Sequence, residues 1–183
     1  MGIEESLILE VQRGDLHAFS GIYEAYYERV FRYVLVRTGN RAEAEDLASE
    51  VFLKALEAVN GYKLTGAPFA AWLFRIAHNL IIDNARRKAK RPTTELDERL
   101  PLLQDSPAEL VELGITADEV KEAMAELTDA QRQVVALRFG GSLSLAETAK
   151  AMDKKEGAIK ALQHSAIQAL RRVLAKRGHE IPA

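Results

Sequence analysis

Apolar residues recur along most of the chain at a spacing of three or four, which is the period of one face of an α-helix. Leu47, Val51 and Ala55 fall on one side of such a helix, and Asn40 is a suitable N-cap for it. A second stripe of apolar residues follows Pro68. The alternating β-branched pattern that is typical of strands is missing, so we expect an all-α fold.

Helix starts and breaks divide this pattern into two parts. Serine or threonine followed three residues later by glutamate or glutamine marks a helix start. Such capping boxes stand at Ser106–Glu109, Thr116–Glu119, Thr128–Gln131 and Ser144–Glu147. Residues 92–105 hold two prolines, four acidic residues and little periodicity, which indicates a linker. We expect two small helical domains, residues 1–91 and 117–177, joined by an acidic linker, 92–116, and followed by a tail, 178–183.

Residues 144–164 have the pattern of a helix-turn-helix. Ala149 is a small residue at the point where two short helices would touch. The residues spaced to face the first helix of the domain are Leu145, Met152, Ile159 and Leu162. Asp153 occupies the turn, where a left-handed backbone is needed, and aspartate adopts that conformation more readily than most residues. The alternative is a plain helical hairpin with a lysine-rich surface.

Charge is strongly segregated, although 25 basic and 27 acidic residues give a net charge of only −2. Residues 61–91 and 150–177 each carry +6, and residues 92–126 between them carry −8. Two basic blocks suggest two contacts with a polyanion, although solvated charged faces would look the same. Lys154 and Lys155 stand at a helix start, where positive charge opposes the helix dipole unless a phosphate binds.

Several function classes are excluded or disfavoured. The chain has no cysteine, which excludes disulfides, thiolate metal sites and a cysteine nucleophile. Its longest unbroken apolar run is the six residues Phe69–Phe74, whereas a membrane-spanning helix needs ~20, so we expect no membrane insertion. No His-Glu-x-x-His motif, phosphate-binding glycine loop or nucleophile elbow is present. We therefore expect no enzymatic activity, metal or cofactor.

Two parts of the chain together resemble the extracytoplasmic-function (ECF) group of the sigma-70 family of bacterial RNA polymerase sigma factors. The part that resembles region 2 holds AEDLASEVFLKAL (44–56) and AWLFRIAHNLIIDNARR (71–87). The part that resembles region 4 holds Leu127–Arg138, Gly157–Lys160 and Ala169–Arg172. The similarity covers residues 7–91 and 117–174, in the family's order and with a linker between them.

The resemblance implies a cytoplasmic sigma factor that directs core RNA polymerase to specific promoters. Region 2 would dock on the clamp helices of the largest subunit and read the −10 element as single-stranded DNA. Region 4 would bind the −35 duplex and the flap of the second-largest subunit. The linker would thread through polymerase, and an anti-sigma factor is an expected partner.

Candidate residues can be placed on this frame. For −10 DNA they are Tyr62, Arg75, His78, Asn79, Ile82, Arg86 and Arg87. For −35 DNA they are Lys154, Lys155, Glu156, Ala158, Lys160, Ala161 and His164. For polymerase they are Glu45, Asp46 and Glu50, unless these form only a solvated acidic face.

The resemblance assigns the residue matching Asn79, together with the preceding loop Gly61–Gly66, to a base flipped from the stack. Tyr62 in this loop is the candidate for stacking on that base. His78 has a competing interpretation as a neutral surface histidine.

One departure from the family and one alternative function remain open. Leu162, Gln163, Ser165 and Ile167 stand where many relatives carry basic or differently patterned residues, so the −35 sequence cannot be transferred from a relative. The alternative is a helix-turn-helix repressor or activator whose helical N-terminal domain binds a protein partner.

Overall fold

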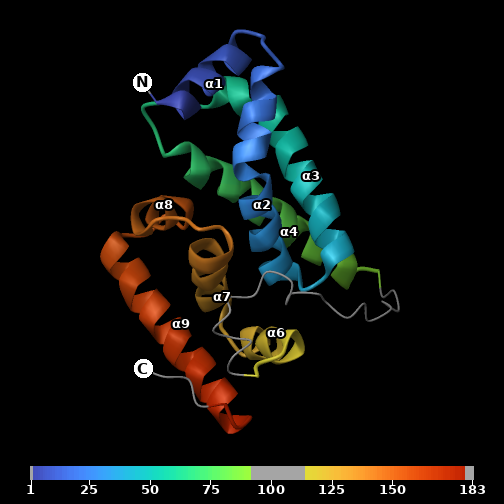
Figure 1. Cartoon of the computed structure of the whole chain (residues 1–183), viewed down its shortest axis with the longest axis vertical. Helices are drawn as coiled ribbons and strands as arrows, with labels where there is room; N and C mark the ends of the chain where they lie inside the picture. Colours follow the sequence, from blue (N-terminus) through green and yellow to red (C-terminus); the bar gives the residue numbers. More distant parts are fainter. Residues whose placement is uncertain (1, 92–113, 180–183) are drawn as a thin grey trace.

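The computed structural model describes residues 2–91 and 114–179, and every regular element in these residues is a helix. The first domain holds α1 (Ile3–Gln12), α2 (Ala18–Thr38), α3 (Arg41–Ala58), the 3₁₀ turn η1 (Val59–Gly61) and α4 (Phe69–Ala89). The second domain holds α6 (Ala117–Ala125), α7 (Asp129–Val135), the π-helical turn η3 (Ala136–Gly140), α8 (Leu145–Ala151) and α9 (Glu156–Lys176) (Figure 1). The all-α prediction is confirmed. Residues 92–113, which include most of the expected linker and the box at Ser106–Glu109, lie outside the described residues.

An aromatic and aliphatic core holds the first domain together around α2, which contacts α1, α3 and α4 (Figure 1). Val30 and Tyr33 of α2 and Phe69 and Phe74 of α4 are almost completely buried. Burying one such side chain contributes ~1.5–3 kcal/mol. This packing fixes the position of α4 and therefore of the polar side that α4 turns away from the core.

The predicted helix starts form in the structure. The Asn40 side chain accepts a hydrogen bond from the Glu43 backbone N–H at 2.9 Å. Complete capping boxes begin α6, α7 and α8 at Thr116, Thr128 and Ser144. These local signals depend only on neighbouring residues, which explains why the sequence alone locates them.

The predicted helix-turn-helix is α8 and α9. Asp153 adopts the left-handed backbone expected of the turn, with φ of +52°. Ala149 of α8 and Ile159 of α9 are both buried, in the same apolar cluster. Lys155 is the N-cap of α9 and makes no side-chain capping bond.

The second domain packs directly on the first, an arrangement that the sequence had left open. The Tyr33 hydroxyl of α2 donates to the side-chain oxygen of Gln133 in α7 at 2.8 Å. Arg29 Nε donates to the Gly141 carbonyl at 2.9 Å. Leu137 of η3 belongs to the apolar core of the first domain. The contacts of η3 with α2 and of α8 with α4 complete the docked arrangement.

Candidate nucleic-acid interface

Most of the residues expected to contact −10 DNA lie on α4. Arg75, Asn79, Arg86 and Arg87 are exposed, and Ile82 is half-buried. The Asn79 amide offers both a donor and an acceptor to a base edge. The arginines can bind phosphate, so this helix combines base reading with backbone binding.

Two residues of the expected −10 set contact the second domain. The Arg75 guanidinium donates to the backbone carbonyl of Lys150 in α8. His78 is half-buried, and this burial, followed by the nearby Arg37, lowers the pKa of its imidazole. Its Nδ1 is buried without a hydrogen-bond partner among the described residues. In the docked arrangement Arg75 is bonded to α8 and His78 is half-buried, and their roles at −10 DNA stay predictions.

The structure corrects the interpretation of Tyr62 as a stacking ring. Its side chain is only 9% exposed, and its ring centroid lies 5.4 Å from that of Phe69 and 5.2 Å from that of Trp72. Burial raises the pKa of the phenol. The ring is part of the core and has no free face for a base. The sequence around Tyr62 gives no sign that the ring is buried, because the burial comes from Phe69 and Trp72 and not from the residues of the loop.

The turn before α9 and the first turns of α9 expose every residue expected to contact −35 DNA. These residues are Lys154, Lys155, Glu156, Ala158, Lys160, Ala161 and His164. Because the Lys155 side chain does not cap α9, the first backbone N–H groups of this helix can donate to another acceptor. These N–H groups and the neighbouring lysines together suit a phosphate.

Polar contacts from α7 and η3 fix the orientation of α9. Gln131 Nε2 donates to Ser165 Oγ at 2.9 Å, and Arg138 Nε donates to the Gln163 side-chain oxygen at 2.9 Å. Gln163 and Ser165 are two of the positions where the sequence departs from the common basic pattern. In this chain they anchor the helix to its own domain.

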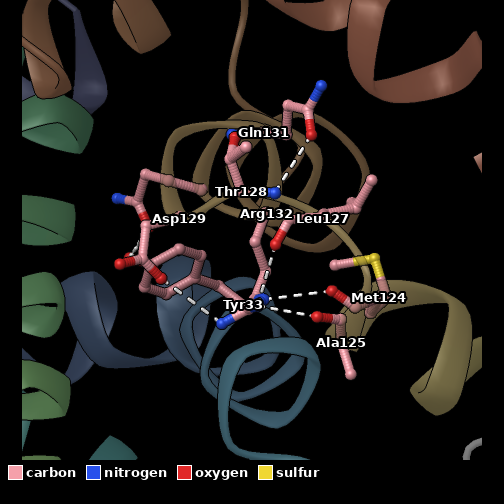
Figure 2. Close-up of polar contacts among 9 residues, drawn as sticks. Tyr33, Met124, Ala125, Leu127, Thr128, Asp129, Gln131 and Arg132 are labelled. Carbon is pink, nitrogen blue, oxygen red and sulfur yellow. Dashed lines mark hydrogen bonds and ion pairs between the residues drawn. The ribbon is translucent and has the colours of Figure 1, made fainter. Parts of the chain in front are cut away.

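Arg132 joins α6 to α7 beneath this helix. Its guanidinium donates to the carbonyls of Met124 at 3.1 Å and Leu127 at 3.0 Å. Figure 2 shows these bonds together with Tyr33, whose bond to α7 ties the first domain to the same helix. Sequence reasoning missed Tyr33 and Gln133, because they are 100 residues apart and no local pattern links them.

The residues expected to bind polymerase lie on α3 and are Glu45, Asp46 and Glu50. The first two are exposed and the third is half-buried. Leu53 on the same helix is 63% exposed. Beside it, Tyr23 and Tyr27 stack at 5.0 Å, and Tyr23 meets Phe52 edge-on at 4.8 Å. An acidic surface next to exposed aromatic and aliphatic groups is suited to a protein partner with basic and apolar groups.

Two further properties hold for the described residues, 2–91 and 114–179. They contain no cluster of three or more histidine or acidic side chains that could hold a metal ion. No helix among them is both long enough and apolar enough to cross a membrane.

Solved structures with a similar fold include two proteins that were each solved in complex with a partner. CnrH, solved with the cytosolic domain of CnrY, matches with a TM-score of 0.72 at 19% identity, covering 96% of this chain and 99% of that one. The sigma factor RpoE, solved with the anti-sigma factor NepR from Bartonella quintana, matches with a TM-score of 0.68 at 20% identity, covering 86% and 96%. At 19% and 20% identity, this similarity shows the fold alone.

Sequence comparison is more specific. Residues 22–91 match Sigma-70 region 2, and residues 123–172 match Sigma-70, region 4. The ECF RNA polymerase sigma factor BldN of Streptomyces coelicolor is 38% identical over 92% of this chain, which spans 64% of the length of that protein. SigD of Mycobacterium tuberculosis is 33% identical over 91% of this chain and 82% of its own length. SigW of Bacillus subtilis is 28% identical over 91% and 94%.

The two matched regions carry the exposed sides of α4 and α9. The resemblance inferred from the sequence is thereby confirmed, and the alternative of an unrelated helix-turn-helix regulator is not favoured. The chain belongs to the ECF group of the sigma-70 family of RNA polymerase sigma factors.

Proposed function

We propose that the protein directs core RNA polymerase to specific promoters and has no catalytic activity of its own. The observation that carries this proposal is the pair of exposed sides on α4 and α9, each in a matched sigma region. Asn79 with its neighbouring arginines would read −10 DNA as a single strand. The start of α9 would enter the major groove of the −35 duplex. Such a protein acts in the cytoplasm, where promoter DNA and polymerase are.

Polymerase binding is assigned to two surfaces. The acidic surface of α3, with the neighbouring aromatic side chains of α2, would meet the clamp helices of the largest subunit. The second domain would meet the flap of the second-largest subunit. An anti-sigma factor is a further proposed partner, supported by the structurally similar sigma factor RpoE, which was solved in complex with the anti-sigma factor NepR.

The docked arrangement explains why such a protein would need polymerase. In this arrangement Arg75 is exposed but donates to the Lys150 carbonyl of α8, and His78 is half-buried beside α7, so docking engages part of the set assigned to −10 DNA. Polymerase would have to hold the two domains apart, because the −10 and −35 elements are separate stretches of one promoter. The free chain is therefore expected to bind promoter DNA poorly.

The test is transcription from promoter DNA by purified core polymerase with and without this chain, together with a core-polymerase pull-down at low salt. The proposal predicts core binding and transcripts that start at defined promoters only when the chain is present. A chain that binds duplex DNA alone and does not bind core polymerase would instead be a helix-turn-helix regulator.

A further inference from the structure

The last residue of α1 reaches across to the loop before α4. Gln12 Nε2 donates to the Val59 carbonyl at 2.8 Å and to the Tyr62 carbonyl at 2.9 Å. These carbonyls stand at the two ends of η1, where α3 gives way to the loop. Figure 1 shows α1 beside this part of the chain. One side-chain amide thus fixes the point from which the loop departs.

Tyr62 fixes the other end of the same loop. Its hydroxyl donates to the Ala67 carbonyl at 2.9 Å, one residue before the N-cap of α4. Within the loop, the Gly66 N–H donates to the Lys63 carbonyl at 3.0 Å. The buried ring of Tyr62 prevents this closure from swinging outward, because Phe69 and Trp72 pack against it.

The result is a short loop, residues 63–67, held at both ends. Lys63 and Thr65 are exposed in it, while Leu64 is half-buried and packs on the apolar core of the first domain. A loop held in one shape loses less conformational entropy when it binds a ligand than a free loop does. Its exposed groups therefore stay in place relative to the start of α4.

We propose that Gln12 is a positioning residue for −10 recognition, and that Gln12 and Tyr62 together hold the 63–67 loop in the conformation that recognises the base. This inference rests on the proposed function and on the family resemblance, which assigns a flipped base to Asn79 and the Gly61–Gly66 loop. Gln12 belongs to α1, a helix that supplies none of the residues assigned to DNA. Its substitution should change which base is preferred while leaving the docking of polymerase on α3 intact.

Two variants separate this role from general stability. Gln12→Glu keeps the size of the side chain but replaces the donor with a carboxylate that faces two carbonyl oxygens. Tyr62→Phe keeps the buried ring and removes only the hydroxyl bond to Ala67. Arg13→Gln is the matched control, since it makes the same change in charge at the next, exposed residue.

The measurement is binding of each holoenzyme to single-stranded −10 oligonucleotides that carry each base at the flipped position. Gln12→Glu removes two hydrogen bonds and Tyr62→Phe removes one, and each should reduce the preference for the best base by at least about 2- to 10-fold. Core-polymerase affinity should stay within about twofold of the parent, as should every property of Arg13→Gln.

Three results would overturn the inference. An unchanged base preference in both variants would show that the loop needs no such support. An equal loss of affinity for all four bases, accompanied by a lower melting temperature, would assign Gln12 to stability alone. A parent holoenzyme without any base preference would instead overturn the proposed function, and the inference would fail with it.

Discussion

Gly140 lies so close to Tyr33 that a β-carbon at residue 140 would stand 3.2 Å from the Tyr33 α-carbon and 3.3 Å from its nitrogen. Gly140 does not have a positive φ, so its backbone conformation is open to any residue. The glycine therefore permits the close approach of η3 to α2. The three atoms nearest to an added β-carbon belong to Arg32 and Tyr33 of α2.

Gly140→Ala should weaken the docking of the two domains by about 1–3 kcal/mol, because α2 would have to move away from the added methyl group. Small-angle scattering should show a larger radius of gyration, while circular dichroism should show unchanged helix content. Gly157→Ala is the control, since a β-carbon there would meet nothing within 4 Å. A variant at residue 140 that stays as compact as the parent would contradict this role.

Docking should also weaken in acid through His78. Burial and Arg37 of α2 lower the pKa of its imidazole, while Gln133 and Asp129 of α7 act in the opposite direction but do not reverse the shift. A lowered pKa means that the docked state resists protonation. Docking is therefore fully stable above the ordinary histidine pKa of about 6.5 and weakens as the pH falls below it.

Fluorescence transfer between labels on α3 and α9, followed from about pH 8 to about pH 5, measures this effect across the range in which histidine titrates. His78→Gln should flatten the profile. His164→Gln, which alters an exposed histidine on α9, should leave it unchanged. A parent profile that is already flat would show that His78 does not report on docking.

Asn79→Ala should change base preference at the −10 element by ~1–3 kcal/mol, because the lost amide can no longer pair with a base edge. Binding to core polymerase should be unaffected. Asn84→Ala is a matched control on the same helix, where the amide donates to Glu43 of α3. Equal loss of transcription on every −10 variant, with the order of preference kept, would count against base reading by Asn79.

Lys160→Ala should weaken −35 duplex binding by the holoenzyme. A lysine that contacts only phosphate would lower affinity about equally for all sequences and reduce the salt slope by roughly one. A lysine that reads a base edge would change the preference at one position. Lys176→Ala, near the other end of α9, is the control and should change neither the affinity for the −35 duplex nor the base preference. If Lys160→Ala also changed neither, Lys160 would not contact the DNA.

The features that could be predicted from the sequence are those that depend on interactions between residues close together in the chain. The box at Thr128 and the left-handed turn at Asp153 depend on residues within one helical turn, and both are present. The exposure of Lys160 follows from helical period once buried Ile159 is placed on the core side. These features needed no knowledge of the rest of the fold.

Interactions between distant segments could not be predicted in this way. The reason for glycine at residue 140 is the close approach of α2, which no pattern around Gly140 indicates. Tyr62 looked like an exposed ring until Phe69 and Trp72 closed around it. In both cases the deciding neighbour comes from tertiary packing, for which a single sequence carries no periodic signal.

The bonds from Gln12 to the loop give the integrity of α1 a consequence for promoter choice. A shorter product that lacks α1 would keep α3, α4 and the second domain, and with them the residues assigned to polymerase and DNA. It would lose the amide that holds the Val59 and Tyr62 carbonyls. We therefore expect an affinity tag that displaces α1 to alter which promoters respond, although every residue assigned to DNA stays unchanged.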